Sequence, residues 1–339
     1  MICLLEVHMV NTLKLPVGID SFEKIRRNGF YYIDKTNLIE QILMNWGEVT
    51  LFTRPRRFGK TLNMSMLNCF FSRQYAEKGT IFEGLSIWKQ EKYRRLQGTY
   101  PVIFLSFADV KQNNYQDAVQ KIKNIIVDAY RQHRYLEQEE CFTQNEKQQM
   151  LEITEKMSDV TAQDALKNLS SYLNLLYGKK VLIFLDEYDT PMQEAYIHGY
   201  WDEFVGFMRS LFNATFKTNP YLERAVMTGI TRISKESVFS DLNNLTVITT
   251  TSDAYADCFG FTEEEVFQSL DQFGMPEKKD LVKQWYDGFC FGTHRDIYNP
   301  WSITNYLKEK KLRPYWAATS SNGLISKLLQ SASVNMKEE

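Results

Sequence analysis

Residues 49–61 read VTLFTRPRRFGKT, and the order of residue types in this stretch predicts a strand, a loop and a helix. The run 49–53 is short and apolar and follows the turn signal Trp46-Gly47, which is typical of a buried strand. Beyond Lys60, apolar residues recur at helical spacing at Leu62, Met66, Leu67, Phe70 and Phe71. A loop between a buried strand and a helix N-terminus can bind an anion through its backbone amides.

The end of this loop supplies the second half of the phosphate-loop pattern GxxxxGK[ST]. Gly59 would let the backbone approach a phosphate, Lys60 would reach the β- and γ-phosphates, and the Thr61 hydroxyl would bind magnesium. The residues expected to contact the nucleotide are Arg57, Phe58, Gly59, Lys60, Thr61 and Leu62. The pattern requires glycine at position 54, where this chain has Arg54. The GKT triplet alone also fits an ordinary helix start with an exposed lysine.

A second motif, VLIFLDE at residues 181–187, places two acids directly after a continuous apolar run. Such a run is typical of a strand that is buried on both faces of a parallel sheet. The carboxyl ends of parallel strands form the ligand-binding edge of these sheets. We therefore expect Asp186 to hold magnesium, directly or through water, and Glu187 to act as general base toward an attacking water. The alternative interpretation is an ordinary strand-ending turn.

Polar residues also follow the strand expected at 225–228. Thr228 would contact the γ-phosphate or the attacking water, and Arg232 would stabilise charge in the transition state, as an arginine finger does. Both residues fit equally well in a turn whose polar side chains are satisfied locally. We include Thr228 and Arg232 with Lys60 and Glu187 as candidate catalytic residues.

Other charged residues lie near the expected site without an assigned task. Arg54, Arg56 and Arg57 would either add forked donors to the phosphate-binding field or form ion pairs with nearby acids. Asp109 and Asp189 also lie close to expected strand ends. Their position alone assigns them no role.

The rest of the chain alternates strand and helix patterns, which predicts a three-layer α/β sheet. Further strands are expected at 101–107, 181–185, 225–228 and 246–250. The pattern changes near residue 260, where Thr262 and Glu265 form a capping box and Asn299 precedes Pro300 at a second helix start. We therefore expect an N-terminal extension at 1–36, a P-loop domain at 37–260 and a mainly helical, lid-like domain at 261–339.

Composition narrows the classes of function. The 40 Lys and Arg residues are balanced by 42 Asp and Glu residues, so the chain has no global basic field that would attract nucleic acid. This balance does not exclude a local basic patch. No apolar run approaches the roughly 18–20 residues of a membrane span, and the apolar run at the N-terminus is too short for a secretion signal. The five cysteines are dispersed without zinc-ligand spacing, as in a reducing compartment. We expect a cytoplasmic protein without a membrane partner.

Six stretches closely resemble the predicted AAA-ATPase-like family found in bacteria. They are LPVGIDSFEKIRRNGFYYIDKT (15–36), FTRPRRFGKTL (52–62), YPVIFLSF (100–107), VLIFLDEYDTP (181–191), TGITRISKESVFSDLNNL (228–245), and YDGFCFG with YNPWSI (286–303). The resemblance implies a P-loop fold of the additional-strand class that uses ATP and Mg²⁺. Lys60, Thr61, Asp186 and Glu187 match the nucleotide motifs of the family, and the missing first glycine is a family trait.

Motifs and resemblance together predict an ATPase whose Mg²⁺-dependent hydrolysis of ATP controls the conformation of an effector domain or a protein partner. One alternative is a non-hydrolysing module that nucleotide binding gates. Another is a nucleic-acid-binding regulator that uses residues 54–57 or Lys308, Lys310 and Lys311. Members of the family often continue into a PD-(D/E)XK nuclease-like domain. We find no such constellation before Glu339, which indicates a fragment or a member without that domain.

Overall fold

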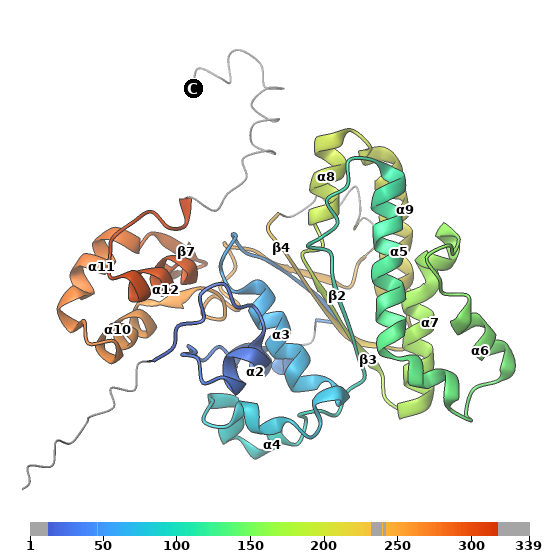
Figure 1. The fold of residues 1–339 in the computed structure, drawn as a ribbon, viewed down its shortest axis with the longest axis horizontal. Coiled ribbons are helices and arrows are strands. Elements are labelled where there is room, and N and C mark those ends of the chain that lie inside the picture. Colours follow the sequence, from blue (N-terminus) through green and yellow to red (C-terminus); the bar gives the residue numbers. More distant parts are fainter. Residues whose placement is uncertain (1–12, 46, 232–238, 240–241, 318–339) are drawn as a thin grey trace, which may run out of the picture.

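The computed structural model describes residues 13–45, 47–231, 239 and 242–317. Its central sheet has five strands in the order β2-β3-β4-β1-β5, and every neighbouring pair is parallel (Figure 1). The strands are β1 Val49–Thr53, β2 Val102–Ser106, β3 Val181–Asp186, β4 Leu222–Gly229 and β5 Leu245–Ile248. The carboxyl ends of all five strands therefore lie at one edge of the sheet.

The strand order confirms the P-loop fold of the additional-strand class. β4 lies between β1, which precedes the GKT triplet, and β3, which ends at Asp186. Two strand spacings separate β1 from β3 by about 10 Å, a span that a triphosphate can bridge. All residues of β1 and β3 are buried, as their continuous apolar sequences predict. β4 begins three residues before the predicted strand, and β5 ends at Ile248 rather than at residue 250.

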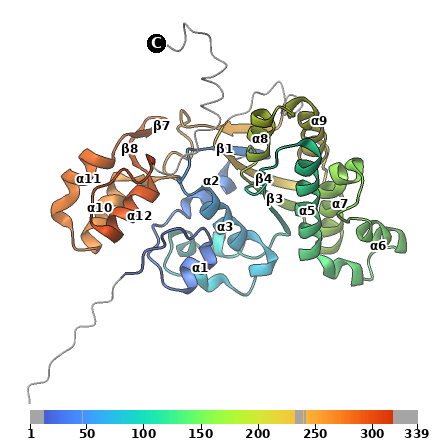
Figure 2. The ribbon, with the colours of Figure 1, turned by 45° about the horizontal axis from the view of Figure 1, so that its top comes forward.

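Helices cover both faces of the sheet and complete three layers (Figures 1 and 2). The helices of this part are α1 Phe22–Arg27, α2 Asn37–Met44, α3 Lys60–Phe71, α4 Glu91–Arg94, α5 Tyr115–Gln132, α6 Gln144–Leu151, α7 Asp159–Tyr177, α8 Thr190–His198 and α9 Trp201–Phe212. Successive strand residues point to opposite faces. Thus Ile183 packs in the core under α5, α7 and α9, whereas Phe184 packs in the core under α3.

Residues 261–317, called here the C-terminal region, have a hydrophobic core of their own. Their helices are α10 Glu263–Gln272, α11 Lys279–Tyr286 and α12 Pro300–Glu309, and their strands are β6 Phe261–Thr262, β7 Phe289–Phe291 and β8 His294–Tyr298. The structure confirms the capping box of Thr262 and Glu265 and the N-cap at Asn299. The sequence did not predict the small antiparallel sheet β6-β8-β7. The assignment of the C-terminal region as a lid-like domain stays a prediction.

Two further features bear on the class of protein. Within the part of the chain that the structure describes, no helix has the length and apolarity needed to cross a bilayer. Four cysteines in that part, Cys69, Cys141, Cys258 and Cys290, are free thiols.

Candidate functional site

The loop between β1 and α3, called here the 54–59 loop, has two residues in the left-handed backbone region. These are Arg57, with φ of 67°, and Gly59, with φ of 81°, which is also the N-cap residue of α3. Left-handed residues occur in the backbone nests that bind anions. A non-glycine residue such as Arg57 adopts this conformation at a cost of roughly 1–2 kcal/mol. The loop therefore combines an anion-binding type of backbone with local strain.

Lys60 begins α3 and folds back over this loop. Its side chain is only 6% exposed, although the residue lies at the start of a helix. The Nζ atom donates hydrogen bonds of 3.0 Å to the carbonyl oxygens of Arg54 and Pro55. Burial lowers the pKa of the Lys60 ammonium, and the negative charges of Asp189, Glu187 and Asp186 oppose that shift. The strand-end acids are thus close enough to act electrostatically on the loop lysine.

Asp186 ends β3 and has a buried carboxylate with one oxygen bonded and one free. Its Oδ1 accepts a hydrogen bond from the Thr228 hydroxyl. Its Oδ2 has no hydrogen-bond partner among the described residues, and the residue is 1% exposed. A buried carboxylate oxygen without a partner is costly. A divalent cation, whose preferred ligands are such oxygens, would satisfy it, so the residues present fit a magnesium site.

Glu187 follows directly and is held in a left-handed conformation, with φ of 52°. Its backbone N–H donates to the Thr228 hydroxyl oxygen over 3.3 Å. Its carboxylate accepts a hydrogen bond of 3.1 Å from the hydroxyl of Thr190, the first residue of α8. The Glu187 side chain is therefore oriented by a helix start instead of extending freely from a turn.

One cavity of about 950 Å³ contains both the loop and the acids. Its polar wall consists of residues 56–63 together with Asp186 and Glu187. The lining also includes residues 15–20 of the N-terminal segment, the name used here for residues 13–36, and Trp301 of α12. A volume of this size can hold a nucleotide, since small-molecule sites range over about 300–1,000 Å³. The cavity thus unites sequence segments that lie more than a hundred positions apart.

Most of the predicted site residues line this cavity. They are Arg57, Phe58, Gly59, Lys60, Thr61, Leu62, Asp186 and Glu187. Thr228 is the exception, because it is buried and does not line the cavity. The Thr228 hydroxyl donates to Asp186 and accepts from the Glu187 amide, and its contact with a phosphate or an attacking water stays a prediction. Arg232 lies outside the described residues.

Neither interpretation of the loop arginines is right for Arg54. Its guanidinium is fully buried and forms no ion pair with a described acid. It donates to the carbonyl oxygens of Thr53 and Tyr255, and it lies 4.6 Å from the ring centre of Phe291. Arg57 likewise contacts an aromatic ring, that of Trp301, at 4.4 Å.

Asp189 is a central residue of this edge that the sequence left without a role. It is fully buried, and its Oδ2 accepts hydrogen bonds from the backbone N–H groups of Ile230 and Thr231 at 2.9 and 2.8 Å. A Cβ atom at Gly229 would lie only 2.7 Å from Asp189 Oδ1, so this close approach requires glycine. The only sequence signal was the position of Asp189 near a strand end.

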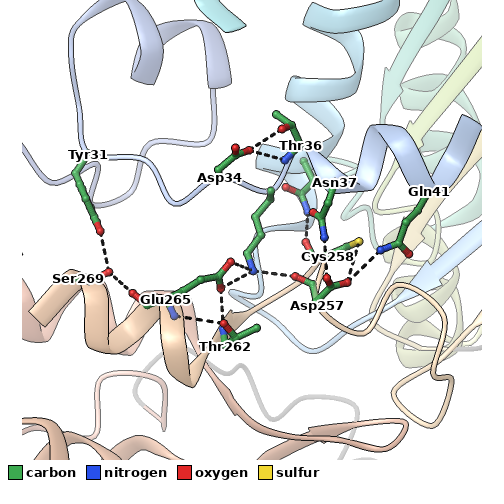
Figure 3. A network of polar contacts seen from close by, with 12 residues as sticks. Tyr31, Asp34, Thr36, Asn37, Gln41, Asp257, Cys258, Thr262, Glu265 and Ser269 are labelled. Atoms are coloured by element: carbon green, nitrogen blue, oxygen red, sulfur yellow. Dashed lines mark hydrogen bonds and ion pairs between the residues drawn. The ribbon is translucent and has the colours of Figure 1, made fainter. Parts of the chain in front are cut away.

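The N-terminal segment is joined to the C-terminal region by a buried polar network, drawn in Figure 3. Lys35 is 6% exposed, and its ammonium donates to both carboxylate oxygens of Glu265, at 2.7 and 2.6 Å, and to the carbonyl oxygen of Asp257 at 2.8 Å. The Asp257 carboxylate in turn accepts from Asn37 and Gln41. Lys35 also lines the cavity. The network therefore fixes one wall of the cavity against α10.

Comparison with known proteins agrees with this architecture. A relative from Azotobacter chroococcum mcd 1, "Uncharacterized protein in vnfD 5'region", is 28% identical over 322 residues. That match covers 93% of this chain and 56% of the relative, so the chain spans about half the length of the protein it matches. The family model described as "Predicted AAA-ATPase" matches residues 16–239, about two thirds of the chain. With its five-stranded P-loop sheet, this chain belongs to the predicted AAA-ATPase family.

Proposed function

We propose that this protein binds ATP with Mg²⁺ in the cavity and hydrolyses it. One observation carries the proposal most directly: residues 56–63 and the acids Asp186 and Glu187 line the same cavity. The unpartnered, buried Oδ2 of Asp186 adds a ligand of the kind that Mg²⁺ prefers. Family membership supports nucleotide use in general.

The residues divide the work in this proposal. Lys60 would exchange its two loop carbonyls for phosphate oxygens, since both are neutral acceptors and a phosphate is charged. Thr61 and Asp186 would hold Mg²⁺, which supplies charge neutralisation for the phosphates. Glu187 would accept a proton from the attacking water. Thr228 is a positioning residue for Asp186 and Glu187.

Hydrolysis would control the conformation of an effector domain or a partner. The support for this part is that Trp301 of α12 and residues 15–20 line the same cavity as the loop and the acids. A nucleotide that contacts both the loop and these elements would bind one arrangement of them better than another. Loss of the γ-phosphate would then release that preference.

The first test is nucleotide turnover with Mg²⁺, measured for wild type beside Lys60→Ala. We expect turnover to fall at least about 100-fold in the variant, because a donor aimed at developing charge is lost. Lys111→Ala is the control, an exposed lysine that also lines the cavity. Equal turnover in wild type and Lys60→Ala would contradict the proposal.

The second candidate function is a nucleotide-gated module without hydrolysis. It is favoured by the hydrogen bond that already engages the Glu187 carboxylate, from the Thr190 hydroxyl. Glu187→Gln separates the two functions. For an ATPase we expect ATP binding to persist and turnover to fall by about 10²–10⁴-fold, the usual contribution of a general base. For a non-hydrolysing module, wild type itself would show no turnover above the Lys60→Ala background.

A further inference from the structure

Arg54 occupies the position at which the phosphate-loop pattern has its first glycine. Glycine is required where φ is positive or where backbones approach closely. Arg54 is not among the described residues with positive φ, and its N–H donates to the Gly229 carbonyl over 3.1 Å, at the last pair of β1 with β4. The left-handed positions of this loop are instead Arg57 and Gly59. The backbone at position 54 therefore tolerates a side chain.

That side chain leaves the loop and is buried against other parts of the chain. The guanidinium lies 5.5 Å from the ring centre of Phe259 and 4.6 Å from that of Phe291, the last residue of β7. Its NH2 group donates to the Tyr255 carbonyl over 3.4 Å, and its Nε has no partner among the residues described. Burying a cation without a carboxylate partner is costly in free energy. A guanidinium exposed to solvent would not have this cost.

The main chain of Arg54 has a separate contact with the site. Its carbonyl oxygen accepts one of the two hydrogen bonds from Lys60 Nζ. One residue thus contacts the cavity lysine through its carbonyl, and residues 255–259 and Phe291 through its guanidinium. A displacement of Phe291 or of residues 255–259 would act on the buried Arg54 side chain, whose backbone carbonyl accepts the hydrogen bond from Lys60.

Residues 255–259 are also held from two other directions. Asn63 of α3 donates to the Cys258 carbonyl over 2.9 Å, and Lys35 donates to the Asp257 carbonyl over 2.8 Å. The segment is therefore bonded to the N-terminal segment, to α3 and, through Arg54, to the 54–59 loop. These contacts connect the segment to three elements that surround the cavity.

We propose that Arg54 is a positioning residue that couples the placement of Lys60 to the placement of residues 255–259 and β7. The coupling itself needs no nucleotide, and only its consequence for ATP affinity rests on the proposed function. Nucleotide binding and the position of the C-terminal region then become linked, and each changes the other by the same factor.

Hydrogen exchange without nucleotide tests the coupling directly. In Arg54→Met, we expect faster amide exchange in residues 54–62 and 255–260 together, with no change in β2. Phe291→Leu, which keeps the arginine and removes one ring, should produce the same pattern. Arg73→Met is the control, since Arg73 is an exposed arginine 4.4 Å from the ring centre of Tyr177. Faster exchange throughout the chain, or in only one of the two segments, would overturn the proposal.

Nucleotide affinity provides the second readout. Arg54→Gly restores the standard pattern, yet we expect it to weaken ATP binding about tenfold, the size of one typical coupling free energy. Combining it with Phe291→Leu should add little further loss, because both changes interrupt the same contact. Affinity in Arg54→Gly equal to or above that of wild type would contradict the proposal. If wild type binds no nucleotide, the proposed function fails, and the exchange experiment still decides the coupling.

Discussion

The two edges of the central sheet are built on different principles. At the carboxyl edge, Arg57 and Glu187 adopt left-handed conformations without being glycine. Asp186 and Asp189 there have the two buried carboxylate oxygens that lack a partner among the described residues. At the amino edge, the left-handed position before β3 is Gly178, with φ of 60°. Strain and unsatisfied charge are thus tolerated at one edge and avoided at the other.

This difference indicates that the residues at the amino edge stabilise the fold, whereas those at the carboxyl edge bind a ligand. Residues in sparsely populated conformations persist only where the surrounding structure holds them, and they cluster at functional sites. At the amino edge, polar side chains bond one another: Lys179 donates to the Thr99 hydroxyl over 3.0 Å, and Asn219 donates to the Ser170 hydroxyl over 3.1 Å. Asn244 Oδ1, which lacks a partner among the described residues at this edge, is an uncharged amide oxygen. We therefore expect substitutions at the amino edge to change stability alone.

The largest effect on folding is expected from Asp189→Ala. Its carboxylate accepts hydrogen bonds from Ile230, Thr231 and Gln193, and their donors would lose a buried acceptor. We expect the free energy of unfolding to fall by about 3 kcal/mol, measured by urea denaturation. The control is Asp109→Ala, an exposed acid on the same cavity. A loss below that of the control would break the claim that this carboxylate organises the edge.

The next effect is a pH dependence at the amino edge. Burial lowers the pKa of His133 to about 4 from 6.5, and a hydrogen bond to the backbone of Val102 opposes the shift. Between pH 6.5 and 4 the unfolded chain binds the proton and the folded chain does not, so stability falls as the pH is lowered through this window. We expect the loss to reach about 2–3 kcal/mol. The measurement is urea denaturation at several pH values.

His133→Phe provides the control for this titration. The variant should lose that part of the pH dependence while keeping Mg²⁺-dependent turnover at neutral pH. An unchanged pH profile in the variant would show that other groups dominate acid destabilisation.

A smaller loss of stability is expected from Gly178→Ala. The added Cβ meets no atom within 4 Å, so only the backbone conformation is penalised. We expect the free energy of unfolding to fall by about 1 kcal/mol, with turnover unchanged within about twofold. A larger change in turnover would break the separation between the two edges.

The smallest effect should have the opposite sign. Glu187→Gly relieves the left-handed strain at the carboxyl edge but loses the hydrogen bond from Thr190 and increases the entropy of the unfolded chain. We expect a net gain of roughly 0.5 kcal/mol in the free energy of unfolding, together with loss of turnover. Thermal unfolding of the variants Gly178→Ala and Glu187→Gly, measured beside wild type, shows whether each variant is less or more stable. A destabilised Glu187→Gly variant would show that the strain is not stored at this residue.

Local features could be predicted from the sequence, whereas side-chain contacts between residues far apart along the chain could not. The strand 49–53, the helix beginning at Lys60 and the capping box of Thr262 follow from periodicity and capping rules. The acids of residues 186–187 could be predicted as cavity residues because they end a continuous apolar strand. The family resemblance added the prediction that the P-loop fold belongs to the additional-strand class.

The contacts that the sequence could not reveal join residues far apart along the chain. Arg54 binds the Tyr255 carbonyl across 201 positions, and Lys35 binds Glu265 across 230 positions. A local pattern carries no information on such partners, so both interpretations of Arg54 were wrong. The bond between the Thr228 hydroxyl and Asp186 likewise depends on β3 and β4 being neighbours in the sheet.

Electron paramagnetic resonance of Mn²⁺, used in place of Mg²⁺, tests the central claim most directly. With ATP present, we predict one bound Mn²⁺ per chain whose signal shows coupling to phosphate ³¹P. Lys60→Ala and Asp186→Ala should each abolish this bound signal, because loop and acid hold the same metal nucleotide. A Mn²⁺–ATP signal of wild-type strength in Asp186→Ala would contradict the account.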